Sequence, residues 1–250
     1  MNCKTIVVCG QKGGSGKTTT AQALAIQLAR LFDWKVLLVD ADEQQSLSKF
    51  SDARPDELRE KLKVAFAQMF KQSIAHDIRA QKENYDLIVV DSGGRAANVM
   101  KGAMLVSDLA IIPCRPGQKD VETLDFMETF VSEIQVTNPN LSAKVLVNQA
   151  SSHNKETGSA EVIELVNSEY ETMNAYDNKL CYRAIYDECD RLGKTIYEYK
   201  NDFKAKNEFN NFLAQVILDL EIDESLAKPV LESLLSQERY NELTKEMGAA

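Results

Sequence analysis

The sequence contains few of the residues from which metal centres and disulfide frameworks are built. Its 250 residues include two histidines and five cysteines, and no two cysteines form a C-x-x-C pair. His76 and His153 lie far apart and have no neighbouring cluster of cysteines or carboxylates. These absences argue against a histidine- or cysteine-based metal site and against a disulfide framework. We therefore expect the cysteines to be reduced thiols of a cytosolic protein.

Long apolar runs and an excess of positive charge are missing as well. No run approaches roughly 18 apolar residues, so we expect no membrane-spanning segment. Met1 and Asn2 lead straight into an apolar run, which leaves no room for a signal peptide. The formal net charge of −9 argues against a generally basic nucleic-acid-binding protein, although it is compatible with a local basic patch. Together these features predict a cytoplasmic protein.

The most informative stretch is a glycine-rich loop at residues 10–19, with the sequence GQKGGSGKTT. It follows the β-branched run 5–9 and precedes a helix-like segment at 21–28. In this context, closely spaced glycines let backbone N–H groups and a helix N-terminus surround a polyphosphate. Lys17 would reach the β- and γ-phosphates, and the Thr18 hydroxyl would bind Mg²⁺. The predicted nucleotide contacts in this part of the loop are Gly13, Gly14, Ser15, Gly16, Lys17, Thr18 and Thr19.

The loop departs from the pattern G-x-x-x-x-G-K-[ST] at its start. Gln11 stands where the first glycine belongs, and a second lysine, Lys12, follows it. The resulting K-G-G-x-G-K-T-T resembles the deviant Walker A motif of the ParA/MinD family of ATPases. The resemblance implies that Lys12 crosses a homodimer interface and touches the nucleotide bound by the other subunit. The alternative interpretation is a glycine-rich turn that binds no ligand.

Aspartates follow two apolar runs that have the composition of buried strands. Runs 34–40 and 85–91 end in Asp40 and Asp91. Asp42 comes two residues after the first run. The carboxyl ends of parallel strands form the edge at which ligands bind in open α/β sheets. Asp91 has the position of a Walker B aspartate, where it would hold Mg²⁺ through a water molecule.

The segment after the first of these runs resembles the V-D-x-D-P-Q-x-S stretch of the ParA family, with Glu43 in place of the usual proline. The resemblance places Asp40 near Mg²⁺ and gives Asp42 the task of orienting the attacking water. Orientation is most of what phosphoryl transfer requires of the protein. In the alternative, Asp40 and Asp42 cap the following helix. The predicted catalytic residues are Lys12, Lys17 and Asp42, and the predicted metal ligands are Thr18, Asp40 and Asp91.

Further apolar runs predict the remainder of the sheet. Segments 64–67, 108–113 and 143–149 have the length and composition of strands. Pro113 is expected to end its strand. About seven strands alternating with helices predict an α/β fold, with a doubly wound, mostly parallel sheet and helices on both faces, as in P-loop NTPases. The resemblance gives Asn148 a contact with the nucleotide base, whereas an asparagine that caps the strand end is the alternative.

The resemblance covers about residues 4–220, and we predict one ATPase domain over residues 1–220. Residues 221–250 are expected to form a helical extension with an apolar stripe, in which Pro229 lies near a helix start. Seven acidic residues against three basic ones in this extension argue against a membrane-binding helix. We expect the extension to pack on the domain or to bind a partner protein.

The resemblance implies a Mg²⁺-dependent ATPase that forms a homodimer around ATP and separates after hydrolysis. It favours a short ParA protein of plasmid partition, in which ATP-bound dimers bind nonspecific DNA and a centromere-binding adaptor protein stimulates hydrolysis. Such a protein would be associated with the nucleoid. DNA binding requires clustered cations on one face. The candidate cations, interleaved with six acidic residues, are Arg183, Arg191, Lys194, Lys200, Lys204 and Lys206.

Other functions are compatible with the same motifs. A ParA-like ATPase that positions another cargo, such as a conjugation or protein complex, would keep the ATP site and lose the basic patch. A metabolic P-loop enzyme would leave Lys12 without an obvious task. A nitrogenase-reductase-like ATPase would need cysteines after the Walker B strand, where Cys114 stands alone. A nonenzymatic, nucleotide-gated scaffold would differ only in whether Asp42 supports turnover.

Overall fold

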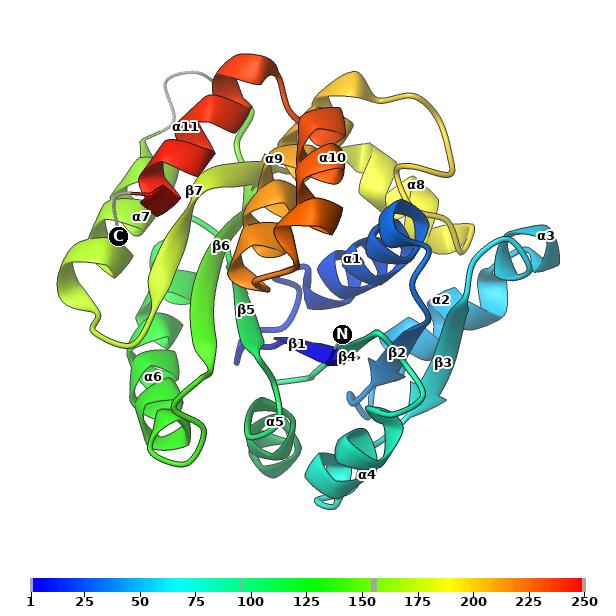
Figure 1. Ribbon diagram of the computed structural model, residues 1–250. Coiled ribbons are helices and arrows are strands. Elements are labelled where there is room, and N and C mark those ends of the chain that lie inside the picture. The colour runs from blue at the N-terminus through cyan, green and yellow to red at the C-terminus, as the bar shows by residue number, and fades with distance from the viewer. Residues whose placement is uncertain (1, 95, 154–156, 249–250) are drawn as a thin grey trace.

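The computed structural model describes residues 2–94, 96–153 and 157–248. These residues form a seven-stranded sheet in the order β3-β2-β4-β1-β5-β6-β7, in which every neighbouring pair is parallel (Figure 1). This architecture confirms the predicted doubly wound α/β fold. The strands are β1 (Lys4–Val8), β2 (Val36–Asp40), β3 (Val64–Gln68), β4 (Leu87–Asp91), β5 (Leu109–Cys114), β6 (Ser142–Ala150) and β7 (Asn174–Cys181).

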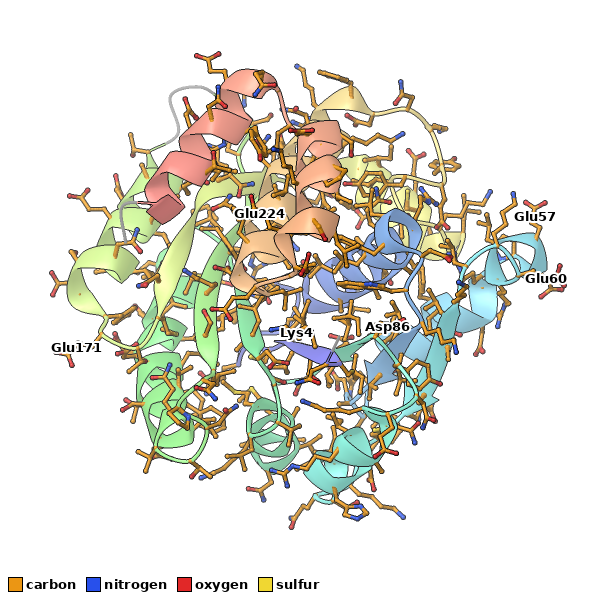
Figure 2. All side chains as sticks on the ribbon, viewed as in Figure 1. Lys4, Glu57, Glu60, Asp86, Glu171 and Glu224 are labelled. Carbon is orange, nitrogen blue, oxygen red and sulfur yellow. The ribbon has the colours of Figure 1, made fainter. Side chains whose placement is uncertain are left out.

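Helices cover both faces of the sheet and enclose two hydrophobic cores (Figure 1). The short α3 (Asp56–Arg59) lies at the periphery, where Glu57 and Glu60 point away from the body of the protein (Figure 2). The first core receives side chains from α1 (Lys17–Phe32), α2 (Ser46–Ala53), α8 (Ala184–Arg191), α9 (Phe203–Asp219), α10 (Glu224–Leu234) and α11 (Gln237–Gly248). The second core receives side chains from α4 (Ile74–Gln81), α5 (Ala97–Met104), α6 (Gln118–Gln135) and α7 (Gly158–Glu169).

The central strands are mainly apolar between their ends because both of their faces are buried. Along β1, Ile6 and Val8 enter the first core, whereas Val7 enters the second. The edge strand β7 has a different composition, with polar residues at positions 177–179. The expectation of about seven strands is therefore met, but the apolar runs predicted only six of them. An edge strand pairs on one side only, so it needs no continuous apolar run.

Pro113 does not end its strand, contrary to expectation. It pairs with Leu146 of β6, and β5 continues to Cys114. The carbonyl of Ile111 accepts a hydrogen bond from Cys9, so Ile111 and Pro113, two residues apart, direct their backbone groups toward β1. The β1–β5 ladder has already ended at Ile111. Pro113 therefore lacks its N–H at a position where the ladder makes no hydrogen bond.

The C-terminal extension continues the first core. Ala227 and Leu231 of α10 are buried in the same cluster as the apolar face of α9, whereas Leu226 is exposed. Pro229 lies in the interior of α10 and not near its start, because the Asp223 carboxylate accepts from the Ser225 N–H and begins the helix earlier. The division at residue 220 stays a prediction. No helix in the described ranges is long and apolar enough to cross a membrane.

A buried ion pair ties α2 to the loop that precedes α9. The side chains of Arg54 and Glu198 are 1% and 2% exposed. Two parallel hydrogen bonds of 2.7 and 3.0 Å join the Arg54 guanidinium to the Glu198 carboxylate, which also accepts from Thr195. Burial alone would raise the pKa of Glu198, but the hydrogen bonds and charge of Arg54 outweigh it and hold the pKa below its usual value. Glu198 is therefore ionised in the folded protein.

We expect Arg54→Ala to destabilise the protein by about 3 kcal/mol, because it removes both guanidinium hydrogen bonds from the buried Glu198 carboxylate and leaves it only the half-exposed Arg30, 3.4 Å away. Urea denaturation followed by circular dichroism measures the change. Lys63→Ala is the matched control, since Lys63 pairs with Asp33 on the exposed surface and should contribute about 0–1 kcal/mol. Equal, small losses in the two variants would show that the buried pair does not hold these segments together.

Candidate functional site

The candidate site lies at the carboxyl ends of the central strands. β1 has β4 on one side and β5 on the other, so the chain winds outward from β1 in both directions. Such a switch in winding direction opens a crevice at this edge of an α/β sheet. The glycine-rich loop leaves β1 here and ends at Gly16, the N-cap of α1. The structure thus provides the strand, loop and helix that a phosphate site requires.

The loop conformation depends on glycine at its junction with α1. Gly16 has a φ of +93°, and a Cβ at this position would overlap the Asn148 side-chain amide. Lys17 is buried directly after it, and its Nζ donates to the backbone oxygen of Lys12 at 2.7 Å. Burial lowers the pKa of Lys17, whereas the carboxylates of Asp91 and Asp42 act in the opposite direction. The Lys17 ammonium is therefore held at the loop, near two acidic groups.

The second lysine of the loop is in a different situation. Lys12 is half-buried, and its ammonium makes no hydrogen bond or ion pair within the described part of the chain. Its backbone oxygen accepts from Lys17, so Lys12 is fixed at the main chain and free at the tip of the side chain. A cation without an intramolecular partner is available to an anion brought by a ligand or a second subunit. Its predicted role at a dimer interface stays a prediction.

The structure brings Thr18 and Asp91 together. The Thr18 hydroxyl donates to Asp91 at 2.7 Å, and Asp91 is paired in register with Asp40. Burial raises the pKa of Asp91 to about 7; the hydrogen bond from Thr18 and the charge of Lys17 oppose the rise, and the carboxylates of Asp40 and Asp42 add to it. A cation at this position would favour the charged carboxylate.

The donor set fits Mg²⁺, which takes oxygen ligands and is usually held by one or two carboxylates together with substrate phosphates. The described residues include no group of three or more His, Cys, Asp or Glu side chains that could hold a metal by themselves. A Mg²⁺ ion at Thr18 and Asp91 would therefore need further ligands from phosphates and water. Asp40 already accepts from Ser48 through one carboxylate oxygen and from the Asp42 N–H through the other. Ser48 lies in the first turn of α2, so Asp40 also secures the start of that helix. Its predicted contact with Mg²⁺ stays a prediction.

Asp42 lies against the two glycines that follow Asp91. A Cβ at Gly93 would overlap the Asp42 carboxylate, and a Cβ at Gly94 would overlap the backbone of Gln11. Asp42 Oδ1 accepts from the N–H of Gln44, which holds its carboxylate beside this turn. The segment after β4 thus contacts both the Asp42 segment and the start of the phosphate loop. Gly94 lies too close to the Gln11 backbone for a side chain, whereas a methyl group at Gly93 would have to displace the Asp42 carboxylate.

Two amide side chains at the tip of β6 hold the phosphate loop from the other side. Asn148 donates to the backbone oxygen of Ser15 at 2.8 Å, and Gln149 donates to that of Gly14 at 2.9 Å. Gln149 has a φ of +53°, a conformation uncommon outside glycine. The sequence had indicated Asn148 as a contact of the base, which stays a prediction. It gave no indication of Gln149, whose backbone conformation no local pattern marks.

A pocket opens beside this junction. The N-terminus of α1 and the tips of β6 and β7 form its inner end, and α8 and α9 close its sides. It reaches the end of the phosphate loop at Gly16. Its lining residues are Gly16, Thr19, Thr20, Asn148, Gln149, Leu180, Cys181, Tyr182, Arg183, Tyr186, Asp187 and Phe209.

Comparison with known proteins agrees with this geometry. Residues 6–243 match the CobQ/CobB/MinD/ParA nucleotide binding domain. The match covers nearly the whole chain, so the protein belongs to this family of nucleotide-binding P-loop proteins.

Individual relatives are more distant. The chain is 32% identical over 115 residues to protein ParA of Rhizobium radiobacter, which is 46% of this chain and 50% of that protein. It is 33% identical over 122 residues to the maintenance of carboxysome distribution protein A of Gloeobacter kilaueensis, 48% of this chain and 53% of that protein. The matched segments thus span about half the length of these two relatives.

A solved structure shows the same fold over most of its length. The septum site-determining protein MinD from Pyrococcus horikoshii, complexed with Mg-ADP, superposes with a TM-score of 0.66 at 18% identity. The superposition covers 86% of this chain and 96% of that protein.

We expect Gly93→Ala to lower the rate of ATP hydrolysis roughly 100-fold, because the added methyl group displaces the Asp42 carboxylate from its position beside the phosphate loop. Phosphate release measures the rate, and nucleotide affinity should change little. Gly117→Ala is the matched control, since a Cβ there meets no atom within 4 Å. An unchanged rate for Gly93→Ala would remove Asp42 from the catalytic residues.

Proposed function

We propose that this protein is a Mg²⁺-dependent ATPase that dimerises around ATP and acts in the partition of DNA. The two lysines of the phosphate loop are the main support for this proposal. Lys17 is buried and committed to its own loop, whereas the ammonium of Lys12 has no partner within the described residues. Within one subunit, the Lys12 ammonium binds no described residue. A second subunit with its own bound nucleotide would provide phosphates for this ammonium to bind.

The residues around the loop would divide the work of hydrolysis. Lys17 would exchange its contact with the loop backbone for the phosphates, and backbone N–H groups at the start of α1 would bind the same anion. Thr18 and Asp91 would hold Mg²⁺, which neutralises charge on the phosphates when bound. Asp42 would orient the attacking water, since its carboxylate lies beside the segment that follows Asp91. Hydrolysis would then release the contacts that this segment makes, as in switch loops.

ATP is the proposed nucleotide, bound with Mg²⁺ as cofactor. The sequence contains no N-K-x-D guanine motif. The related MinD protein from Pyrococcus horikoshii was solved with Mg-ADP, which agrees with an adenine nucleotide in this family. The proposed homodimer is therefore an ATP-bound state, and the adaptor protein that stimulates its hydrolysis is of the kind that binds centromere DNA.

DNA is the proposed cargo because the Rhizobium relative is a ParA protein. The six candidate cations are not equally available. Arg183 pairs with Glu208, and Lys200 pairs with Glu188 at 2.9 Å. The patch would therefore consist of the remaining four, which no salt bridge to a described residue neutralises: Arg191, Lys194, Lys204 and Lys206.

A second candidate function keeps the switch and changes the cargo. The Gloeobacter relative is a carboxysome distribution protein, and two of the six candidate cations here are paired with acids. A net charge of −9 also disfavours wide contact with DNA. In this case the ATP-dependent dimer would position a protein assembly.

Binding to nonspecific duplex DNA across a salt series separates the two candidates. We expect binding with ATP, none with ADP or without nucleotide, and a steep loss of affinity as salt rises, because phosphate contacts release counterions. Lys204→Glu should abolish binding, whereas Lys71→Glu, an exposed lysine ahead of α4, should not. Absence of DNA binding in every nucleotide state, with ATP hydrolysis intact, would contradict the partition role and favour the protein cargo.

A further inference from the structure

We infer that Tyr186 is a specificity-determining residue whose hydroxyl hydrogen-bonds the nucleoside of the bound nucleotide, with the ring of Tyr182 at the rim of the same pocket as a stacking surface for the base. The inference rests on the proposed function, because it assumes that a nucleoside triphosphate occupies the phosphate loop. It assigns base-side recognition to α8 and to the turn before it, whereas the phosphate contacts come from the loop and α1.

Tyr186 lies beside the pocket at the start of α1. Tyr186 lies in the first turns of α8 and lines the pocket that begins at Gly16 and Thr19. Phosphates held at the start of α1 place the attached sugar and base next to this junction, and the pocket opens from it. Tyr186 therefore borders the part of the pocket next to the nucleoside and not the part next to the triphosphate.

The hydroxyl of Tyr186 is left without a hydrogen bond to the described part of the chain. Its oxygen is buried and has no hydrogen-bond partner among the described residues. Of the described residues that line the pocket, Tyr186 alone has a buried side-chain polar atom of this kind. Buried hydroxyls are nearly always paired in folded proteins, because an unpaired one loses its hydrogen bonds to water without replacement. Such a group beside a ligand pocket is a donor and acceptor reserved for the ligand.

The surroundings keep this hydroxyl protonated. Burial raises the pKa of Tyr186, the carboxylate of Glu208 raises it further, and the guanidinium of Arg183 opposes both. Arg183 and Glu208 are bonded to each other, so neither is drawn to the tyrosine. A neutral phenol can donate to a ring nitrogen or accept from an amino group or a sugar hydroxyl.

Asn148, the residue that the sequence associates with the base, and its neighbour Gln149 are already engaged. Asn148 donates to Ser15 and accepts from the N–H of Gln149, and the Gln149 side chain donates to Gly14. Both side chains thus position the phosphate loop. Recognition of the nucleoside then falls to other groups of the pocket, among which Tyr186 has the buried, unpaired polar atom.

Tyr182 supplies an apolar surface at the pocket mouth. Its side chain is 61% exposed although it is aromatic, and its hydroxyl donates to Asp187 at 3.2 Å, which orients the ring. Stacking of a base on an aromatic ring tolerates any base, so it adds affinity without selecting the base. Selection requires hydrogen bonds, because a site built around a buried polar group rejects a ligand that leaves this group unpaired.

Tyr186→Phe tests the inference through two readouts that should move in opposite directions. Without nucleotide, the variant should melt at the same or a higher temperature, because an unpaired buried hydroxyl has been removed. Its affinity for ATP should fall roughly 5- to 10-fold, the effect of one lost hydrogen bond in a buried site. Inorganic tripolyphosphate, which has no nucleoside, should bind the variant and the wild type equally well.

Tyr197→Phe is the matched control. Tyr197 is also packed against the first core, but its hydroxyl donates to Asn210 at 2.6 Å, and Tyr197 does not line the pocket. This variant should melt at a lower temperature and bind ATP as the wild type does.

Three results would overturn the inference. Wild-type ATP affinity in Tyr186→Phe would show that the hydroxyl does not contact the nucleoside. An equal loss of ATP and tripolyphosphate binding would show that Tyr186 acts through the phosphate loop. A wild-type protein that binds tripolyphosphate but no nucleotide would contradict both the proposed function and the inference. The first two results would contradict the inference alone and leave the proposed ATPase function intact.

Discussion

The conformation of the phosphate loop is the constraint on which the site depends. Glycines allow the loop to turn, but side chains from a distant strand hold it in place: Asn148 and Gln149 at the tip of β6 bind the backbone oxygens of Ser15 and Gly14. Because these oxygens are hydrogen-bonded to β6, the loop is held in a turn whose N–H groups, with those at the start of α1, can bind an anion. The parallel register of β1, β5 and β6 brings the tip of β6 to the loop, so the sheet as a whole positions the site.

The acidic side of the site is organised in a comparable way. Asp91 is fixed by Thr18, Asp40 is bonded to the start of α2, and Asp42 is packed beside Gly93. Each carboxylate thus joins the end of one strand to a neighbouring loop or helix. In the proposed function, a change at the phosphates would reach the segment after β4 and α2, and the exposed residues of α2 could contact a second subunit or a partner. In the proposed function, this connection would form the basis of a switch that responds to the nucleotide.

Much of the fold could be predicted from local patterns, and the exceptions have physical causes. The apolar runs that end in Asp40 and Asp91 and the glycine-rich loop identify central strands and the site, because full burial and tight turns leave strong sequence signals. The edge strand β7 was missed because it needs no apolar run. Pro113 was misplaced because the β1–β5 ladder ends before it, so its missing N–H costs no hydrogen bond. Pro229 was misplaced because the Asp223 cap begins α10 earlier than the proline suggests. The bond of Gln149 to the phosphate loop joins residues far apart in the chain, and so would the proposed role of Tyr186. No spacing in the sequence reveals such contacts.

Sedimentation velocity with a non-hydrolysable ATP analogue, applied to the wild type and to Lys12→Ala, tests the central claim most directly. We expect a dimer for the wild type with the analogue and a monomer with ADP. Lys12→Ala should remain a monomer with the analogue while still binding it, because Lys12 contributes to its own loop only through its backbone oxygen. An analogue-bound dimer of Lys12→Ala as stable as that of the wild type would show that Lys12 does not hold the two subunits together around the nucleotide.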